Sequence, residues 1–170
     1  MGVKLLVVNV MENLVIMRHG EAVPQSSTDS ERQLTSRGQS EVGQMAQWLN
    51  TVYPPFDLIL CSPFIRTQQT AAILHEQLAG QPAVRQLSDL VPDGDCAQVQ
   101  LYLDALLTEQ PLRVLLVSHM PLVSFLVETF SKSGNTPIFD TAAVACLHYD
   151  AGQSGVLLEK MAPAELRLLS

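Results

Sequence analysis

The chain has 170 residues, of which 47% are hydrophobic and 16% are charged, and its formal net charge is −7. This composition excludes an intrinsically disordered chain and is typical of one globular domain with its own core. The negative charge argues against non-specific binding to nucleic acid, which depends on a cationic surface. No stretch reaches the roughly 18 apolar residues of a membrane span, and the N-terminus lacks the small-residue cleavage site of a signal peptide. We therefore expect a cytoplasmic protein without nucleic-acid or membrane partners, and a monomer because no interface pattern is evident.

The three cysteines are widely spaced and form no Cys-x-x-Cys pair; they are Cys61, Cys96 and Cys146. We interpret them as reduced thiols that pack as small hydrophobic groups, which argues against a redox protein. Met11 is also a candidate start, because it lies just before the first expected strand. We expect a single domain over residues 11–170 and assign no function to the extension 1–10.

The first expected strand is the apolar run Leu14–Met17, which has no polar alternation and is therefore typical of a strand buried on both faces. Arg18, His19 and Gly20 follow at once, and ligands of open α/β sheets bind at the carboxyl ends of strands. Gly20 allows a sharp turn or a close approach to a ligand. From these three residues alone, a strand that ends in a solvated charge explains the pattern equally well.

A polar loop over residues 22–33, which contains Arg32, separates this strand from a helix for which Thr35 is the expected N-cap. Pro54 and Pro55 end that helix, and residues 56–61 form the second expected strand. Ser62 as N-cap and Pro63 as first helical residue predict a helix from 63 to about 78. Its first turn places Arg66 at the same edge as His19, where a helix N-terminus favours an anion.

The remaining elements continue the alternation of strands and helices. We expect a short edge strand over 83–87, a turn-rich loop over 88–95, a helix over 97–107, a strand over 113–118 and a helix over 120–130. The strand over 113–118 repeats the opening pattern because it ends in His119. Residues 141–149 and 155–161 form two further strands, paired as a hairpin at one side of the sheet. The alternation predicts a three-layer α/β fold.

Three strand ends thus bring candidate residues to one edge: Arg18 and His19, Arg66, and His119, with Arg32 on a nearby loop. Metal-binding histidines are usually accompanied by carboxylates or cysteines, and arginines repel a metal ion, so this set does not predict a metal site. Arginine forks instead match the oxygens of a phosphoryl group.

A histidine among arginines is also suited to phosphoryl chemistry. Nearby cations disfavour the imidazolium, so we expect His19 to stay neutral and to attack phosphorus in line. The arginines and His119 would stabilise the charge on the equatorial oxygens, and water would hydrolyse the phosphohistidine that forms. We interpret His75, in mid-helix, and His148, in a late strand, as structural.

Four separated motifs, in the right order from Met11 to the C-terminus, resemble the histidine phosphatase (phosphoglycerate-mutase-like) superfamily. They are Met17-Arg18-His19-Gly20-Glu21, Leu34-Thr35-x-x-Gly38, Ser62-Pro63-x-x-Arg66-x-x-Gln69-Thr70 and Val117-Ser118-His119. The loop over 27–35, the run over 118–123 and the tail over 161–166 resemble the SixA-type phosphohistidine phosphatases within it. The resemblance implies a mainly parallel α/β/α sandwich that needs no metal or other cofactor.

The resemblance also implies roles for individual residues. His19 would be the phosphorylated nucleophile, Arg18, Arg66 and His119 would form the phosphate pocket, and Arg32 would be a further ligand. Many family members carry an acidic residue that protonates the leaving oxygen. Asp89 is the best positional candidate here, with Asp93 and Asp95 as rivals, although each is equally explained as a solvated turn carboxylate.

The leading hypothesis is a phosphatase that dephosphorylates a histidine-containing phosphotransfer (HPt-like) domain through a covalent phosphohistidine. The phosphorus–nitrogen bond of that substrate is labile and needs less help from an acid than an alkyl phosphate ester does. Only the short segment 79–96 is free to cap the pocket, which favours a protein substrate. The alternatives are a small-molecule phosphomonoesterase or mutase, and a non-catalytic phosphate-binding module. The module is disfavoured because the pocket includes the nucleophile.

Overall fold

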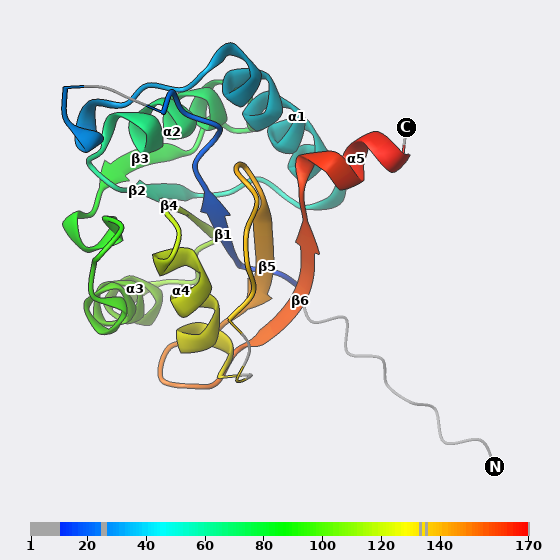
Figure 1. Ribbon diagram of the computed structural model, residues 1–170. Coiled ribbons are helices and arrows are strands. Elements are labelled where there is room, and N and C mark those ends of the chain that lie inside the picture. The colour runs from blue at the N-terminus through cyan, green and yellow to red at the C-terminus, as the bar shows by residue number, and fades with distance from the viewer. Residues whose placement is uncertain (1–10, 25–26, 133, 135, 170) are drawn as a thin grey trace.

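The computed structural model describes residues 11–24, 27–132, 134 and 136–169, so the expected extension 1–10 lies outside the described residues (Figure 1). The strands are β1 (Leu14–Arg18), β2 (Leu58–Cys61), β3 (Ala83–Gln86), β4 (Val114–Ser118), β5 (Val144–His148) and β6 (Val156–Met161). The helices are α1 (Ser36–Val52), α2 (Ile65–Gln77), α3 (Cys96–Glu109), α4 (Leu122–Ser131) and α5 (Pro163–Leu169), with short 3-10 turns η1 (Asp29–Glu31) and η2 (Ser88–Leu90).

All six strands form one sheet in the order β3-β2-β4-β1-β5-β6. β1 is parallel to β4, and β2 is parallel to both β4 and β3. β5 runs antiparallel to β1, and β6 antiparallel to β5. The mainly parallel sheet, the edge position of β3 and the hairpin at the opposite side are therefore confirmed.

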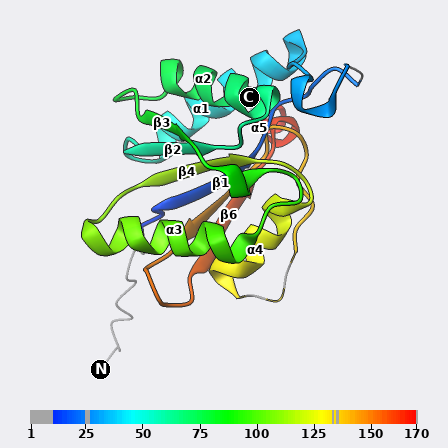
Figure 2. The ribbon, with the colours of Figure 1, turned by 90° about the vertical axis from the view of Figure 1, so that its left-hand side faces the viewer.

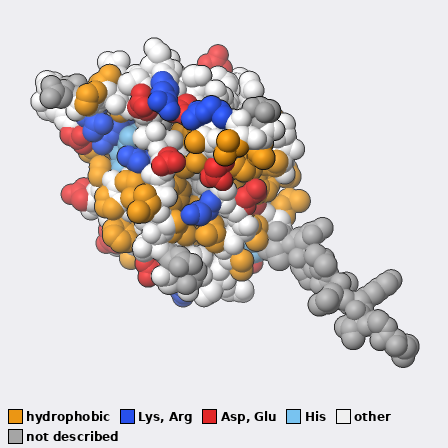
Figure 3. Space-filling model, turned by 45° about the vertical axis from the view of Figure 1, so that its right-hand side comes forward, with side chains coloured by type: hydrophobic (Ala, Val, Ile, Leu, Met, Phe, Trp, Pro, Cys, Tyr) orange, Lys and Arg blue, Asp and Glu red, His pale blue; other side chains and the backbone are white. Residues whose placement is uncertain are grey.

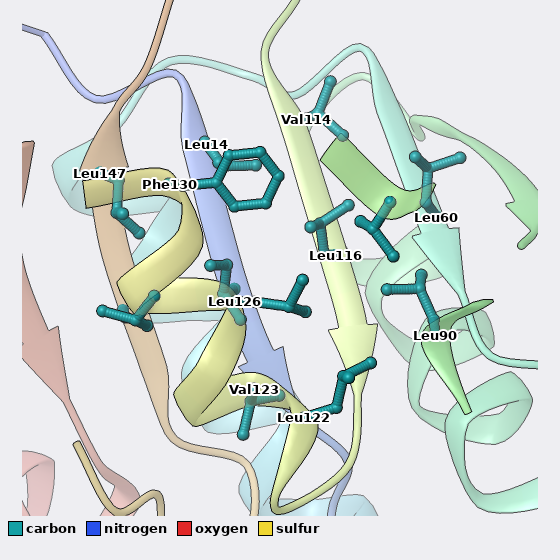
Figure 4. Close-up of a cluster of buried hydrophobic side chains, with 14 of the residues drawn as sticks. Leu14, Leu60, Leu90, Val114, Leu116, Leu122, Val123, Leu126, Phe130 and Leu147 are labelled. Carbon is teal, nitrogen blue, oxygen red and sulfur yellow. The ribbon is translucent and has the colours of Figure 1, made fainter. Parts of the chain in front are cut away.

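The sheet is covered on both faces, with α1 and α2 on one side and α3 and α4 on the other (Figure 2). Alternate residues of β1 feed the two cores: Leu14 and Ile16 pack in the cluster beneath α3 and α4, and Val15 and Met17 in the cluster beneath α1 and α2. Figure 4 shows the first cluster, in which residues of α4 lie over β1 and β4. The three-layer sandwich, and a first strand buried on both faces, are confirmed.

The register of the parallel strands brings three strand ends together. Arg18 pairs with Ser118, and Cys61 pairs with Val117. The ladder continues one step further, since the His19 N–H donates to the Ser118 carbonyl (3.0 Å) and the Ser62 N–H to the Val117 carbonyl (3.2 Å). The residues that follow β1, β2 and β4 consequently meet at one edge of the sheet.

One local prediction was wrong and one helix was missed. Ser62 is not the N-cap of α2, because Phe64 is still extended (φ −65°, ψ 147°) and the helix begins at Ile65. The Ser62 hydroxyl accepts the Phe64 N–H (3.2 Å) in a turn that precedes the helix. The C-terminal helix α5 was not predicted, and it is tied to α1 by an ion pair between Arg167 and Glu41 (3.1 Å).

The buried cysteines pack as expected. Cys61 and Cys146 lie in the cluster beneath α1 and α2, and burial raises the pKa of Cys61 to about 11 and that of Cys146 to about 12. All three cysteines are free thiols. Within the described ranges, none of the helices has the length and apolar character required to cross a bilayer.

Candidate active site

The loop after β1 is pressed against the start of α1, and two glycines allow this contact. A Cβ atom on Gly20 would lie 2.8 Å from the Val42 side chain, and one on Gly38 would lie 2.1 Å from the Glu21 carbonyl oxygen. Thr35 caps α1 as expected, since its hydroxyl accepts the Gly38 N–H (2.9 Å). Gly20 therefore provides a close approach of the backbone to α1, and this packing fixes where His19 lies.

His19 follows β1 directly and is 5% exposed. Its Nδ1 lies 2.7 Å from the Gly20 carbonyl oxygen, an acceptor, so Nδ1 carries the proton and the lone pair is on Nε2. The Arg66 Nε–H donates to that Nε2 (3.2 Å). The pKa of His19 is lowered to about 4, mainly by burial and to a smaller extent by Arg66, Arg18 and Arg32, against the raising effect of the Gly20 carbonyl. The sequence argument attributed the neutral ring to cations alone, but burial is the larger cause.

His119 lies beside His19 at the end of β4, with the two ring centroids 5.2 Å apart. It is 1% exposed, and its other side packs edge-on against Phe64 at 5.0 Å between centroids. Its Nε2 lies 2.8 Å from the Ser62 Oγ, whereas its Nδ1 is buried without a hydrogen-bond partner. Burial lowers the pKa of His119 to about 3, with smaller effects of His19 and Arg66 in the same direction.

Arg66 and Arg32 meet at one carboxylate. Arg66, 4% exposed, donates from Nη1 to the Asp29 carbonyl oxygen (2.7 Å) and from Nη2 to its carboxylate (3.2 Å). Arg32 donates from Nη1 to the other carboxylate oxygen (3.0 Å). Hydrogen bonds from Arg32 and Arg66 hold the pKa of Asp29 below its usual range. The ring of Phe64 lies 5.1 Å from the Arg66 guanidinium carbon.

Arg18 is the last residue of β1, next to His19 in the chain, and its charge acts on the His19 ring. Its Nη1 donates to the Phe139 carbonyl oxygen (2.8 Å), and its Nε is buried without a hydrogen-bond partner. Arg18 also lines a hollow of about 320 Å³ next to the site, with Glu21, Arg37 and Asp140 among the other lining residues. Figure 3 shows Lys and Arg side chains around a small patch of histidine near the top left of that face.

The structure thus brings together Arg18, His19, Arg66 and His119, with Arg32 joined to Arg66 through Asp29. His75 and His148 lie elsewhere: His75 bonds to the Pro82 carbonyl, and His148 to Met11 and Asp150.

The candidate acids are not joined to this group. Across the described ranges, no hydrogen bond or ion pair links Asp89, Asp93 or Asp95 to the two histidines or to Arg66. Asp95 has a structural role, since its carboxylate accepts the Ala97 N–H (2.9 Å) as the N-cap of α3.

Sequence reasoning missed Asp29, Ser62 and Phe64 as parts of the site. Ser62 was assigned to a helix cap, and Asp29 was one of several polar residues in a loop. Ser62, directly after β2, and Phe64, two residues before Arg66, had positions that suggested a place in the site.

The chemistry available here is that of an oxyanion site. One unprotonated ring nitrogen lies near three guanidinium groups and a second neutral histidine, a combination that suits in-line attack on a phosphoryl group. Among the residues that the structure describes, no group of three His, Cys, Asp or Glu side chains is arranged to hold a metal ion.

Comparison with known proteins gives concordant results. Residues 14–90 match the model of the histidine phosphatase superfamily (branch 1). The chain is 36% identical to the phosphohistidine phosphatase SixA of Escherichia coli over 90% of the chain and 95% of that protein. It is 32% identical to a SixA homologue of Haemophilus influenzae over 89% of the chain and 96% of that protein. The solved structure of the protein histidine phosphatase SixA with tungstate has a TM-score of 0.86 and 36% identity, and covers 90% of the chain and 98% of its own length.

Proposed function

The chain belongs to the histidine phosphatase superfamily, and on that premise we propose that it is a SixA-type phosphohistidine phosphatase acting on a histidine-containing phosphotransfer domain. The observation that carries the proposal is the neutral His19, whose unprotonated Nε2 accepts a hydrogen bond from Arg66 and whose pKa is also lowered by Arg18 and Arg32. The relatives support it, since two proteins that match over nine-tenths of the chain are named phosphohistidine phosphatases or their homologues. Tungstate, bound in the related solved structure, is a tetrahedral oxyanion like phosphate.

In the proposed first step, the His19 Nε2 attacks the phosphorus of a phosphoimidazolium on the substrate protein. The phosphorus–nitrogen bond of the substrate breaks, its electron pair stays on the departing nitrogen, and a neutral imidazole leaves. Arg66 releases Nε2 and, with Arg18, Arg32 and His119, binds the equatorial oxygens. His19 becomes a phosphoimidazolium whose Nδ1–H remains bonded to the Gly20 carbonyl.

In the second step, water attacks phosphorus, the bond to Nε2 breaks and its electron pair returns to the ring. The products are dihydrogen phosphate and neutral His19, so charge and protons balance. Neither step needs a carboxylic acid, because each leaving group departs as a neutral imidazole. This agrees with the absence, in the described chain, of a bond between the two histidines and Asp89, Asp93 or Asp95.

A protein substrate also fits the surroundings of the site. The segment expected to cap the pocket consists of β3 and η2, and η2 is held back at the strand end, where the Ser118 hydroxyl donates to the Leu90 carbonyl (2.6 Å). The proposed reaction requires that a histidine on the surface of another domain reaches His19, which is 5% exposed. We further propose that residues 11–170 act as one domain, as a monomer in the cytoplasm, without a metal.

The test is phosphate release from a phosphorylated phosphotransfer domain, measured beside a panel of sugar phosphates with EDTA present. The proposal predicts rapid loss of phosphohistidine and little ester hydrolysis, with activity absent in His19→Ala and retained in the control His75→Ala. Rapid ester hydrolysis with inert phosphohistidine protein would contradict it and would support the small-molecule phosphomonoesterase or mutase. Phosphate binding without any turnover would support the non-catalytic module.

A further inference from the structure

We propose that Ser62 is a positioning residue that fixes the tautomer of His119, so that the neutral ring carries its proton on Nδ1. The inference deepens the proposed function and rests on it for its catalytic meaning. It starts from two facts about one ring: the His119 Nε2 lies 2.8 Å from the Ser62 Oγ, and the Nδ1 has no partner although it is buried.

The hydrogen bonds around Ser62 favour one direction for this contact. The Ser62 Oγ already accepts the Phe64 N–H (3.2 Å), and a hydroxyl has one proton to donate. If Nε2 carried the His119 proton, the oxygen would accept twice and the hydroxyl hydrogen would have no acceptor among the described residues. If the hydroxyl donates to Nε2, the hydrogen without a partner is the one on Nδ1, and a bound phosphoryl oxygen can accept it. With substrate bound, every hydrogen in this group then has an acceptor, whereas the other arrangement still leaves the hydroxyl hydrogen without one. The proton of neutral His119 is then on Nδ1.

The serine is held firmly enough to impose this choice. It is fully buried, and its N–H donates to the Val117 carbonyl (3.2 Å). Its carbonyl accepts the Thr67 hydroxyl (2.9 Å). With both backbone groups bonded, the hydroxyl is positioned next to Nε2 by strand β2 and by the start of α2.

The tautomer matters because His119 stays neutral near pH 7. A neutral imidazole can donate from one nitrogen only, and the nitrogen without a partner is the one available to a ligand. With the proton on Nδ1, His119 offers a donor to a phosphoryl oxygen without bearing a charge. With the proton on Nε2, a lone pair would face the oxyanion and repel it.

The direct test is a long-range ¹H–¹⁵N correlation spectrum of protein labelled at histidine nitrogen, near pH 7 and with saturating inorganic phosphate. The ring signals of His119 are identified as those missing from the spectrum of His119→Gln. We expect wild-type His119 as the Nδ1–H tautomer, a shift toward Nε2–H in Ser62→Ala, and no change in Ser118→Ala. Ser118 is the matched control because it is equally buried at the next strand end and bonds to Leu90 instead. An Nε2–H tautomer in the wild type overturns the inference, even if Ser62→Ala does not fold.

The functional consequence is measured with inorganic phosphate as the probe and with phosphohistidine turnover. Ser62→Ala should weaken phosphate binding and lower kcat/KM by about 10- to 100-fold, the loss expected for one hydrogen bond to a charged group. Ser118→Ala should leave the affinity for inorganic phosphate near wild type. A changed tautomer with unchanged phosphate affinity would overturn the positioning role. If wild type does not hydrolyse phosphohistidine at all, the proposed function fails while the spectrum still decides the tautomer.

Discussion

Two arginines at opposite edges of the sheet, one buried and one partly buried, have similar surroundings. Arg66 lies at the carboxyl edge and Arg113 just before β4 at the other edge, and each guanidinium lies about 5 Å from the centroid of a phenylalanine ring (5.1 and 4.9 Å). Arg66 bonds to one backbone carbonyl and Arg113 to three, and each bonds to one carboxylate, that of Asp29 at 3.2 Å and that of Glu12 at 3.0 Å.

The difference lies in those partners. The Glu12 side chain is fully buried, and all the acceptors of Arg113 are carbonyl or carboxylate oxygens fixed by the chain. The Asp29 side chain is 60% exposed on the short turn η1, and the third partner of Arg66 is the lone pair of His19. Arg113 is therefore part of the fold, whereas a phosphoryl group can exchange with the partners of Arg66.

The largest effect on activity should come from His19, which is the hydrogen-bond partner of Arg66 and has no counterpart beside Arg113. We expect His19→Ala to reduce turnover of a phosphohistidine protein by at least about 10³-fold, because the nucleophile is lost. His75→Ala, a histidine outside the site, should retain activity. Near-normal phosphate release by folded His19→Ala protein would remove His19 from the mechanism.

The two arginines themselves provide the sharpest contrast. Arg66→Ala should lower kcat/KM by about 10²- to 10³-fold, the effect of losing charge stabilisation in the transition state, while the protein stays folded. Arg113→Ala should cost about 3–5 kcal/mol of stability, because Glu12 is left as an unpaired buried carboxylate, while folded protein stays active. Urea unfolding and steady-state kinetics on both variants separate the two effects. A reversed pattern would refute the comparison.

The low pKa values of the two buried histidines should make the stability of the protein depend on pH. The pKa of folded His19 is about 4, against about 6.5 in the unfolded chain, so below pH 6.5 the unfolded state binds the proton first. The contribution of His19 to the free energy of unfolding is therefore fully present above about pH 6.5 and is lost as the pH drops toward 4. From pH 7.5 to 4.5, wild type should lose roughly 2 kcal/mol more than His19→Gln does. Equal losses in urea titrations at the two pH values would show that burial does not hold His19 neutral.

The smallest effect is expected for Asp29. Its carboxylate pairs with Arg66 and Arg32 and therefore competes with phosphate for these two arginines. Asp29→Asn should tighten inorganic phosphate binding by about 3- to 10-fold, since a negative charge near Arg66 and Arg32 is removed. Stability should change by less than about 1 kcal/mol, because the pair is partly exposed. Asp93→Asn, which lies in the turn before α3, is the control. Weaker phosphate binding in Asp29→Asn would mean that Asp29 organises Arg66 rather than competing for it.

The fold and the core of the site were predictable because both follow from strand ends. Uninterrupted apolar runs before Arg18, Cys61 and His119 identified the buried parallel strands, and parallel strands bring their carboxyl ends to one edge. The hydrogen-bond partners were not predictable. Ser62 matched a helix-cap pattern, but the extended Phe64 delays α2, and this leaves the hydroxyl beside His119.

Other features depend on contacts that no local pattern encodes. Asp29 reaches Arg66 across 37 residues of sequence, and nothing in its polar loop distinguishes it from its neighbours. The seven residues of α5 are too few for a clear helical period, and the helix is tied to α1 by Arg167 and Glu41. Burial, the main cause of the low pKa of both histidines, depends on the assembled layers.

The central claim is that His19 takes the phosphoryl group from another histidine, and one measurement tests it directly. A phosphotransfer domain carrying ³²P on its histidine is mixed with the protein, quenched in alkali within milliseconds, and the label is located by peptide mapping. The account predicts transient alkali-stable label on the peptide that contains His19, absent in His19→Ala and present in His75→Ala. Release of labelled phosphate with no label on the chain at any time point would contradict it.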